Sequence, residues 1–423
     1  RMDDIYMGRT IFVTGASGFL GKIMIEKMLY SLPGIKQIYI LVRSSRGRSG
    51  AERWKEYEKL ILFNRIRRDF SERLSKIKII EGDISLPEFG MSSDDIDRVV
   101  RDTSIVFHCA AIIRLNAPLK EAVNVNVQGT MRLLSLCHRM PKLECYLHCS
   151  TCYVNSDKKG TIIEEKLYPP PCDPQIIIEA EELMSDRLFE SIGKEATKMF
   201  GNTYCFTKNL AEHIVNDSNL PALIFRPSGF GGVWTDGIPG WADSFQGVTG
   251  LTALFCTGAI ARIPLDINDH VDAIPVDVVA SAMIVCAAYR MAMSGNSVPI
   301  IHCNSSSLNP LVFKDVWSST IECVFKYPLN NMLATPVLSS LGSDKLERSM
   351  HKMRQKYMGP ALDKLLEIVG QKPFFARLYG RIADSYGQVR KFLTGYTFKT
   401  DNLVSLIDMM EEEDREVCRR RIR

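Results

Sequence analysis

The chain has 423 residues, of which 46% are hydrophobic and 24% charged, and its formal net charge at pH 7 is +4. This composition excludes a disordered or fibrous protein, and so small a basic excess gives no support for nucleic-acid binding. The length predicts two domains rather than one small core.

The first 43 residues predict a strand, a turn, a helix and a second strand. A β-rich apolar run over 10–14 leads into the glycine-containing segment TGASGFLG, which covers 14–21. Apolar residues then recur at helical spacing over 19–29, and a second apolar run covers 37–42. This order of elements is one βαβ unit.

Gly15, Gly18 and Gly21 lie between the predicted strand and helix, with two residues between neighbours. In a dinucleotide-binding turn the first glycine allows the tight turn, the second lets the backbone approach the pyrophosphate, and the third lets helix and strand pack closely. The helix N-terminus then offers free N–H groups to the phosphates. A plain tight turn is the alternative, and the flanking strand and helix favour the dinucleotide site.

The residue at the end of the second strand distinguishes the two nicotinamide cofactors. An acidic residue there would bind the ribose 2′-hydroxyl, but this chain has Arg43, followed by Arg46 and Arg48. A guanidinium group suits a 2′-phosphate, so NADPH is favoured. A solvated loop explains Arg46 and Arg48 equally well.

Two further pairs of residues follow predicted strands and are candidates for cofactor contacts. Asp83 and Ile84 could hold the adenine, with the carboxylate accepting from its amino group. The small side chains of Ala110 and Ala111 would let the dinucleotide pass close to the backbone. Either pair alone carries little weight.

Strands and helices alternate along the first 300 residues, which predicts a Rossmann-type, doubly wound parallel sheet of the α/β class. After a mostly helical connection over 54–74, the further predicted strands cover 77–80, 104–109, 144–149 and 222–225. The predicted helices between them cover 121–139 and 203–215.

Strands fade from residue 308 onward, where 344–357 and 360–369 predict amphipathic helices. We therefore expect a cofactor-binding domain over 1–308 and a smaller, mainly helical C-terminal domain over 309–423.

Tyr204 and Lys208 form a Tyr-x-x-x-Lys spacing within a predicted helix. Four residues are just over one helical turn, so the phenol and the ammonium share a face. A nearby cation is expected to lower the pKa of the tyrosine, which can then protonate a carbonyl oxygen as hydride reaches its carbon. The spacing is common by chance, and the upstream dinucleotide turn makes the catalytic interpretation the better one.

A third catalytic group is expected at the end of the strand over 144–149, which is followed by Ser150 and Thr151. A hydroxyl at this end of a parallel strand faces the ligand crevice and can donate to a developing oxyanion. We favour Thr151, with Ser150 as the alternative. His108 and His148 are interpreted as packing residues, because the tyrosine and lysine already supply the proton.

The twelve cysteines indicate neither a disulfide framework nor a metal site. Most lie in apolar runs, where a free thiol behaves as a small hydrophobe. Cys145, Cys149 and Cys152 are spaced faintly like metal ligands, but a buried strand explains them better. No secretory leader opens the chain, and the strongest apolar stretch, over 278–289, is about 12 residues, where a membrane span needs roughly 20.

Taken together, these segments resemble an extended short-chain dehydrogenase/reductase and, more narrowly, a fatty acyl-CoA reductase. The resemblance covers nearly the whole chain, and its more particular motifs are YPPPCDP (168–174), NTYCFTKNLAE (202–212), FRPS (225–228) and PGW (239–241). More widely shared motifs are TGASGFLG (14–21), ILVR (40–43), FHCAA (107–111), NVNVQGT (124–130), HCSTCYVN (148–155) and PVDVV (275–279), and the tail over 392–423 is similar to the family's C-terminal helical module.

The resemblance implies reduction of a long-chain fatty acyl-CoA to a primary alcohol, with two NADPH consumed and CoA released through an aldehyde-level stage. Thr151, Tyr204 and Lys208 take the family's catalytic positions. The residues implied at the cofactor are Thr14, Gly15, Ser17, Gly18, Phe19, Leu20, Gly21, Arg43, Asp83, Ile84, Ala110, Ala111, Tyr204, Lys208 and Pro227.

Some residues after the FRPS segment are candidates for lining an acyl tunnel, although ordinary core is as good an explanation for each one. They are Phe230, Trp234, Trp241, Phe245, Leu251, Leu254 and Phe255. Cys152 departs from the family's usual alanine and is small enough to be tolerated.

The family resemblance further implies an intracellular enzyme at the peroxisomal or endoplasmic reticulum membrane, with its catalytic domain facing the cytosol. We expect the membrane-associating segments to lie outside this chain, and a homo-oligomer is compatible with the family. The competing interpretations are a nucleotide-sugar epimerase or dehydratase, which shares the cofactor and triad but requires polar sugar contacts, and a non-catalytic cofactor-binding scaffold.

Overall fold

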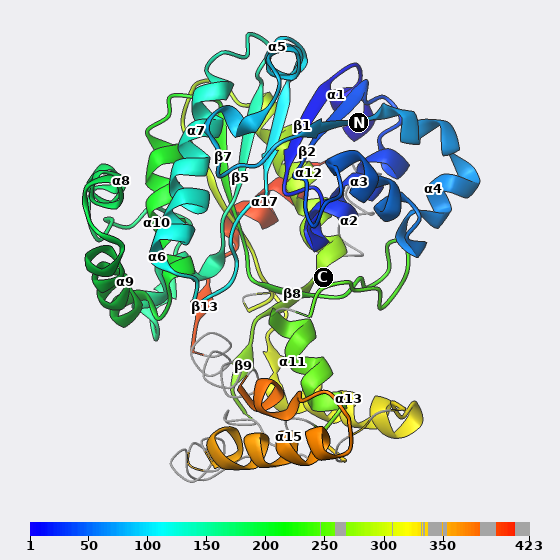
Figure 1. Cartoon of the computed structure of the whole chain (residues 1–423). Helices are drawn as coiled ribbons and strands as arrows, with labels where there is room; N and C mark the ends of the chain where they lie inside the picture. The colour runs from blue at the N-terminus through cyan, green and yellow to red at the C-terminus, as the bar shows by residue number, and fades with distance from the viewer. Residues whose placement is uncertain are drawn as a thin grey trace. The chain divides into compact units, whose positions relative to one another are not determined.

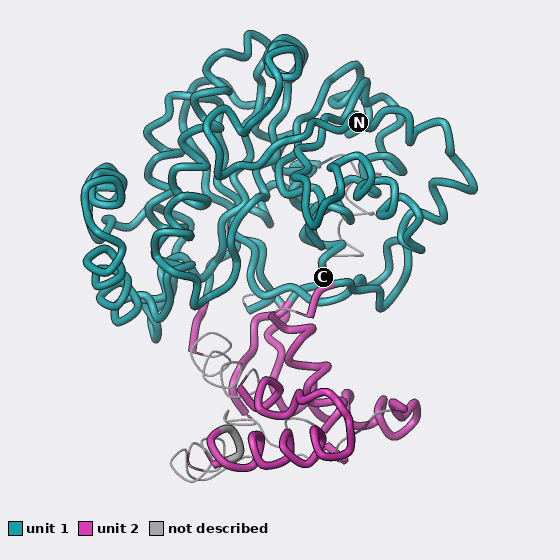
Figure 2. The backbone as a smooth tube through the Cα atoms, viewed as in Figure 1, with its two compact units in different colours: residues 1–243, 274–308, 398–423 teal, residues 244–273, 309–397 magenta. Residues whose placement is uncertain are grey.

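The chain forms two compact units, each assembled from separated stretches of sequence (Figure 2). The computed structural model describes residues 1–245, 247–258, 268–306, 308–330, 332, 335–336, 349, 353–380 and 395–410. Unit 1 comprises Arg1–Asp243, Ile274–Leu308 and Phe398–Arg423, and unit 2 comprises Ser244–Ala273 and Asn309–Thr397.

A parallel sheet forms the centre of unit 1, with its strands in the spatial order β11–β7–β5–β4–β1–β2–β3 (Figure 1). The strands are β1 (Thr10–Thr14), β2 (Gln37–Val42), β3 (Ile77–Glu81), β4 (Ile105–His108), β5 (Cys145–Cys149), β7 (Ala222–Pro227) and β11 (Ile300–Cys303). The chain order reverses between β1 and β4, where open α/β sheets bind their ligands. The predicted Rossmann-type fold is confirmed, with β11 as a strand that the sequence analysis did not predict.

Helices cover both faces of this sheet and create two cores. Alternate residues of β1 show the division, because Ile11 and Val13 enter one core and Phe12 enters the other. The first core lies under α2 (Phe19–Ser31) and α12 (Val276–Ala292), which pack against each other, and the second under α7 (Gly129–Cys137) and α10 (Thr203–Asn216).

The other helices of unit 1 connect the strands or flank the sheet. They are α1 (Met2–Tyr6), α3 (Gly50–Glu58), η1 (Ile61–Phe63), α4 (Asn64–Asp69), η2 (Ser71–Lys76), η3 (Pro87–Gly90), α5 (Ser93–Asp102), α6 (Leu119–Ala122), the π-helical η4 (Val123–Gln128), η5 (Cys152–Lys158), α8 (Pro174–Leu183), α9 (Asp186–Phe200) and α17 (Asp401–Met409). The short strand pairs are β6 (Ile162–Ile163) with β13 (Thr397–Phe398), and β8 (Gly229–Gly231) with β10 (Ala273–Pro275).

Unit 2 is smaller and mainly helical in its described part. Its elements are α11 (Gly247–Cys256), α13 (Phe313–Lys326), η6 (Arg354–Met358), α15 (Gly359–Ile368) and the antiparallel pair β9 (His270–Val271) and β12 (Leu311–Val312). Leu251, Phe255, Val271, Phe313 and Trp317 form its core. The helix predicted over 360–369 corresponds to α15, whereas the one predicted over 344–357 lies largely outside the described residues.

The partition into units differs from the expected division at residue 308. That position is one crossing between the units, but 244–273 joins unit 2 and the segment from residue 398 returns to unit 1. The return has a packing reason, because Leu403, Leu406 and Ile407 of α17 are buried in the core that α2 and α12 cover. Which segments belong to one compact unit is therefore decided by tertiary contacts and not by their order along the chain.

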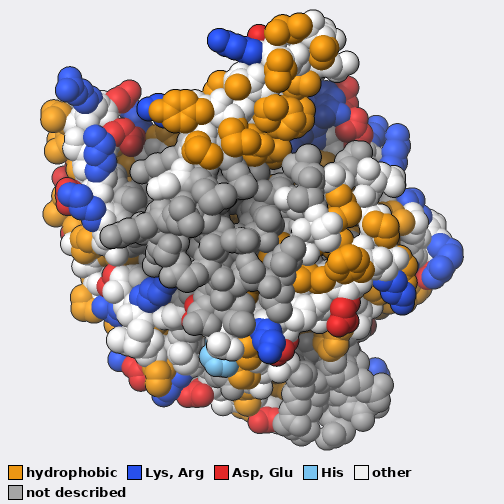
Figure 3. Space-filling view, turned by 90° about the horizontal axis from the view of Figure 1, so that it is seen from below, with side chains coloured by type: hydrophobic (Ala, Val, Ile, Leu, Met, Phe, Trp, Pro, Cys, Tyr) orange, Lys and Arg blue, Asp and Glu red, His pale blue; other side chains and the backbone are white. Residues whose placement is uncertain are grey.

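The apolar run over 278–289 lies inside α12, which is buried on nearly all sides in unit 1. Among the described residues, no helix has both the length and the apolar character that crossing a bilayer would require. Hydrophobic side chains also gather on the surface of the molecule, as the view from below shows (Figure 3). On unit 2 the exposed apolar residues include Tyr357, Leu365, Ile368 and Val369.

Candidate active site

The glycine turn between β1 and α2 has the geometry that close approach of a ligand requires. Gly15 has a φ of +75°, and a Cβ atom there would lie 2.6 Å from the backbone nitrogen of Ala110. A Cβ at Gly21 would overlap the Gly15 carbonyl oxygen, so helix and turn pack without space for a side chain. Gly18 is exposed, and its N–H donates to the Gly15 carbonyl over 3.0 Å.

Helix α2 begins at this turn without a side-chain cap and with no acidic residue in its first turn. Its first N–H groups are therefore available to an anion, as in dinucleotide sites. Ser17 and Phe19 are partly exposed, but Thr14 and Leu20 are buried. The Thr14 hydroxyl is bonded to His108 and to the Ala110 N–H, so Thr14 supports the turn from within.

Arg43 follows β2 directly, and its side chain is 68% exposed. Its guanidinium nitrogen lies 3.8 Å from a carboxylate oxygen of Asp83. The other Asp83 oxygen accepts hydrogen bonds from the backbone and the hydroxyl of Ser85, at 2.9 and 2.8 Å. The structure thus places the predicted 2′-phosphate and adenine residues together at the ends of two neighbouring strands.

The remaining predicted cofactor residues lie along the same edge of the sheet. Ala110 and Ala111 follow β4 and are partly exposed, and the Ala110 N–H donates to the Thr14 hydroxyl over 3.3 Å. Ile84 is buried against Gly129, and Pro227 is buried at the end of β7. Ile84 and Pro227 therefore shape the edge by packing.

Tyr204 and Lys208 lie one turn apart near the start of α10, where the Asn202 side chain accepts a hydrogen bond from the Cys205 N–H over 2.7 Å. Lys208 is 2% exposed, and its Nζ donates to the Cys149 carbonyl over 2.7 Å. The Thr151 hydroxyl lies close enough to the Tyr204 phenol to lower its pKa. The structure brings the three predicted catalytic residues together at the carboxyl end of β5.

The expected pKa of Tyr204 is corrected by the structure. Burial raises this pKa well above its ordinary value, and the nearby Thr151 hydroxyl offsets only part of the increase. The Lys208 ammonium is held by the Cys149 carbonyl, so the predicted lowering by the lysine is wrong for this arrangement. Tyr204 is consequently a neutral phenol at neutral pH, which is the form that can donate a proton.

Ser150 and Thr151 were alternatives for the third catalytic group. The Ser150 hydroxyl is buried and has no hydrogen-bond partner within the described part of the chain. Thr151 contacts Tyr204, and its Oγ1 also accepts from the Tyr153 N–H over 3.3 Å. The contact with the phenol favours Thr151.

The two histidines of the strands are buried and neutral. Burial lowers the pKa of His108 to about 3, and its two ring nitrogens bond the hydroxyls of Thr14 and Thr130 at 2.7 and 3.1 Å. Burial also lowers the pKa of His148, whose Nε2 lies 3.2 Å from the Lys208 Nζ. His108 thus has a packing role, and His148 additionally helps to position the lysine.

Asn126 is a positioning residue that the sequence analysis did not single out. Its side-chain oxygen accepts from the Ile112 N–H over 2.8 Å, and its amide donates to the Ile112 carbonyl and to the Thr207 hydroxyl at 3.2 and 3.0 Å. It lies in the π-helical η4, a type of distortion that is frequent at functional sites. It joins the loop after β4 to the catalytic helix, and only this folded arrangement identifies it.

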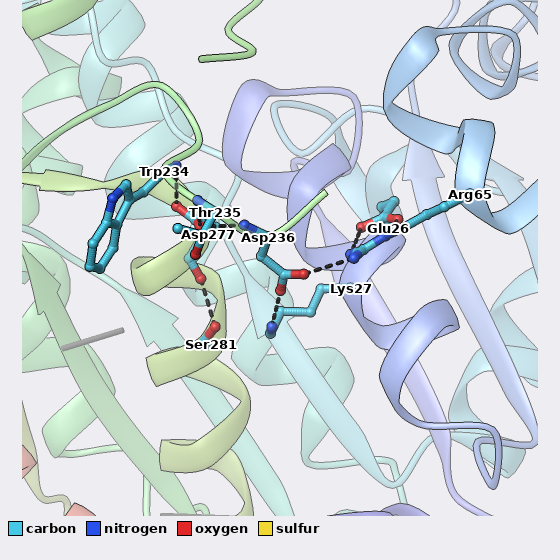
Figure 4. A network of polar contacts seen from close by, with 8 residues as sticks. All are labelled: Glu26, Lys27, Arg65, Trp234, Thr235, Asp236, Asp277 and Ser281. Carbon is cyan, nitrogen blue, oxygen red and sulfur yellow. Dashed lines mark hydrogen bonds and ion pairs between the residues drawn. The ribbon is translucent and has the colours of Figure 1, made fainter. Parts of the chain in front are cut away.

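A second missed feature is a network of charges around Asp277 (Figure 4). The Asp277 carboxylate accepts from the N–H groups of Trp234, Thr235 and Asp236 at 2.9, 3.1 and 3.0 Å. The Asp236 carboxylate in turn bonds Lys27 and, over 2.8 Å, Arg65. The network ties the segment after β8 to α12 and α2.

The same segment continues to Trp241 and lies against the start of α2. The ring centroids of Phe19 and Trp241 are 5.7 Å apart, and those of Phe19 and Phe230 are 6.3 Å apart. An ion pair of 2.8 Å joins Lys22 to Asp243. Asp277 of the PVDVV motif thus holds the segment that leads to PGW, whose Trp241 lies beside Phe19 at the glycine turn.

The candidates for an acyl tunnel separate into different environments. Phe230 and Trp241 belong to the aromatic group at the glycine turn, and Trp234 is 47% exposed. Leu251 and Phe255 are core residues of unit 2, with Leu254 packed against that core, and Phe245 is 79% exposed. Leu251 and Phe255 are therefore ordinary core residues.

The cysteines of the described residues are free thiols. The eleven cysteines in the described ranges are unbridged, and Cys145 and Cys149 are the ends of strand β5. Within these ranges, no group of three or more His, Cys, Asp or Glu side chains could hold a metal ion.

Comparison with known proteins gives consistent relatives. The model of the male sterility protein family, an NAD-binding domain, matches residues 13–283, from β1 to α12. Fatty acyl-CoA reductase 1 of Rattus norvegicus is 31% identical over 415 residues, which cover 97% of this chain and 80% of the relative. Fatty acyl-CoA reductase 1 of Xenopus laevis is 32% identical over 417 residues, which cover 98% of this chain and 81% of the relative.

Solved structures with the same fold include reductase domains and a putative epimerase from Burkholderia cenocepacia. The terminal R domain of the myxalamid PKS-NRPS pathway superposes with a TM-score of 0.65 and 19% identity, covering 97% of this chain and 89% of that domain. The reductase domain of a non-ribosomal peptide synthetase from Mycobacterium tuberculosis superposes with a TM-score of 0.62 and 15% identity. The match covers 96% of this chain and 87% of that domain. These likenesses establish the fold.

Proposed function

The chain belongs to the fatty acyl-CoA reductases of the male sterility protein family, and from this premise we propose that it reduces a long-chain fatty acyl-CoA to a primary alcohol with NADPH. The observation that carries the proposal is that Tyr204 lies one helical turn from the buried Lys208, whose Nζ donates to the Cys149 carbonyl at the carboxyl end of β5.

The residues of the glycine turn fit a dinucleotide. The backbone at Gly15 and Gly21 leaves no room for a Cβ, and the uncapped start of α2 offers N–H groups to phosphates. The exposed guanidinium of Arg43 supports the choice of NADPH, because it can bind a 2′-phosphate bidentately. When bound, NADPH supplies a hydride to the acyl carbon.

The protein's own groups manage the proton and the developing negative charge. Thr151 and Tyr204 donate hydrogen bonds to the acyl oxygen, and the Tyr204 phenol holds the proton that this oxygen takes up. Lys208, fixed by the Cys149 carbonyl, can hold the cofactor ribose. Loss of CoA from the first reduced species gives an aldehyde-level intermediate, and a second hydride transfer gives the alcohol.

A product assay tests this function. Incubation of the purified chain with palmitoyl-CoA and NADPH should yield fatty alcohol, with one CoA released and two NADPH oxidised per alcohol. A series of acyl lengths and a parallel set with NADH would define the substrates. Absence of NADPH oxidation at every acyl length would refute the acyl-CoA assignment, and accumulation of aldehyde alone would refute the two-step reduction.

We also propose that the enzyme acts at an intracellular membrane, peroxisomal or of the endoplasmic reticulum, with its catalytic domain in the cytosol. Support comes from the amphiphilic substrate and from the exposed apolar residues of unit 2, such as Ile368 and Val369. Fractionation of cells with organelle markers, followed by protease protection, tests the placement. Recovery of the full-length protein in the organelle lumen would contradict it.

A further inference from the structure

Two cysteines end neighbouring strands at the edge of the sheet where the active site lies. Cys109 directly follows β4, and Cys149 is the last residue of β5. The strands are parallel, with His108 opposite His148, so the next residue on each strand also lies opposite its neighbour. Both thiols are free and partly exposed.

The geometry of this pair is compatible with a disulfide. Both side chains pack against the core that α2 and α12 cover, so they lie on the same face of the sheet. Neighbouring strands are ~4.8 Å apart, and disulfides join Cα atoms about 4.4–6.8 Å apart. The two thiols lie close enough for each to change the pKa of the other. A bond between the sulfurs can therefore form with the register of β4 and β5 unchanged, through small shifts at the two strand ends.

The surroundings make the two sulfurs chemically different. Interaction with Cys109 lowers the pKa of Cys149, and interaction with Cys149 raises the pKa of Cys109. The nearby Lys208 ammonium also lowers the pKa of Cys149, against the effect of burial. Cys149 is thus the better nucleophile, and Cys109 is suited to resolve its oxidised form.

We propose that Cys109 and Cys149 form a reversible disulfide on exposure to a peroxide, and that this bond inactivates the enzyme. The Cys149 thiolate attacks a peroxide oxygen, the O–O bond breaks, and water and a Cys149 sulfenic acid result. The Cys109 sulfur then attacks the Cys149 sulfur, which forms the S–S bond and releases a second water. Two thiols lose two electrons and two protons, and one hydrogen peroxide becomes two waters.

The disulfide would form between two contacts that the active site uses. The Cys149 carbonyl holds the Lys208 Nζ, and the Cys109 backbone lies directly beneath Gly15 of the glycine turn. Drawing the two sulfurs together shifts both strand ends, and an active site tolerates little displacement of its groups. The disulfide itself does not depend on the proposed function, whereas its effect on turnover rests on it.

Peptide mapping and activity after peroxide treatment test the proposal together. After oxidation and tryptic digestion without reductant, the peptide 102–114, which holds Cys109, should be linked to the peptide 143–158, which holds Cys149. Reductase activity should fall by at least about tenfold and return with dithiothreitol. Fragmentation must place the bond at Cys149, because 143–158 also contains Cys145 and Cys152.

Single substitutions distinguish the Cys109–Cys149 disulfide from oxidation of other residues. Cys109→Ala and Cys149→Ala should each lose the linked peptides and resist peroxide inactivation, with activity compared with each variant's own reduced sample. Cys145→Ala, on the same strand as Cys149, should behave like the original chain. Absence of the linked peptides, or equal peroxide sensitivity in Cys109→Ala, would overturn the proposal. The peptide result stays informative even if the acyl-CoA assignment fails.

Discussion

At the scale of single residues, burial has a larger effect on the pKa values of Tyr204 and Lys208 than their closeness on the helix. Tyr204 and Lys208 share a helical face, yet desolvation raises the pKa of the phenol and lowers the pKa of the ammonium. The lysine is fixed by the Cys149 carbonyl and is close to His148. The tyrosine is therefore set up as an acid, and the lysine as a group held ready for the cofactor.

Replacing Tyr204 with phenylalanine removes the proton donor and leaves most of the packing intact. We expect kcat for acyl reduction to fall by about 10²–10⁴-fold, the usual contribution of a positioned general acid. The dissociation constant for NADPH, from fluorescence titration, should change little. Turnover close to that of the original chain would rule out Tyr204 as the acid.

Arg43→Ala tests the cofactor preference. We expect the NADPH dissociation constant to rise by at least about tenfold, because a charge-assisted bidentate contact is lost, while NADH binding changes little. Arg48→Ala is the matched control and should affect neither cofactor, because the Arg48 guanidinium is paired with Glu56. Equal weakening of NADPH and NADH would remove the 2′-phosphate contact from the proposal.

At the scale of elements, two buried carboxylates hold the functional segments to the sheet. Glu212, on the catalytic helix α10, pairs with Arg226 of β7 through two hydrogen bonds of 2.8 and 2.6 Å, and both side chains are fully buried. Asp277, at the start of α12, accepts three N–H groups of the segment after β8. The first carboxylate positions the helix that carries Tyr204, and the second positions the aromatic group at the glycine turn.

We expect Asp277→Ala to weaken NADPH binding by about tenfold and to lower the free energy of unfolding by roughly 1–3 kcal/mol. The stability loss follows from leaving backbone donors unpaired, and the weaker binding from loosening the segment that packs on Phe19. Fluorescence titration and urea unfolding measure the two effects.

Asp363 provides the matched control for this prediction. Its carboxylate also accepts three N–H groups, those of Phe374, Phe375 and Ala376 at 2.8, 2.7 and 2.9 Å, but it belongs to unit 2. Asp363→Ala should lower stability without changing the dissociation constant for NADPH. If the two variants bound NADPH alike, Asp277 would have no positioning role at the glycine turn.

At the scale of the whole molecule, the end of the described chain is built into unit 1. Strand β13 pairs with β6, and the Glu165 carboxylate accepts from the N–H groups of His302 and Asn402 at 2.7 and 2.8 Å. His302 also lies 3.1 Å from the buried Arg226 guanidinium. Distant parts of the sequence thus share one buried polar network, whose histidine must remain neutral.

The buried histidines predict acid sensitivity. Burial lowers the pKa of His108 and of His302 to about 3, and lowers that of His148 as well. Because the unfolded chain has an ordinary histidine pKa of about 6.5, it binds more protons than the folded chain below that pH. Stability is therefore full above about pH 6.5 and decreases as pH falls toward about 3, by at most about 1.4 kcal/mol per pH unit for each histidine.

Urea unfolding at several pH values between about 7 and 5 measures this slope. His302→Gln should reduce the slope, because one of the histidines whose pKa is lowered by burial no longer titrates. His138→Gln, at an exposed position, should leave it unchanged. A free energy of unfolding that stays constant over this range would contradict the prediction.

Local spacing along the chain was enough to predict much of this protein. The βαβ unit, the glycine turn and the shared face of Tyr204 and Lys208 depend on periodicity and on residues within about one helical turn, so the sequence alone determined them. Thr151 follows a predicted strand, and parallel strands place their carboxyl ends at one edge of the sheet. This rule predicted that Thr151 lies at the ligand-binding edge.

Only the tertiary structure decided the features made by residues far apart in sequence. The raised pKa of Tyr204, the contacts of Asn126, the Asp277 network and the pairing of Cys109 with Cys149 all depend on what the fold brings together. The edge strand β11 and the return of α17 to unit 1 were equally hidden, because burial against a distant element leaves no periodic signal of its partner. Desolvation and long-range contact are properties of the folded chain, and they set the chemistry of the site.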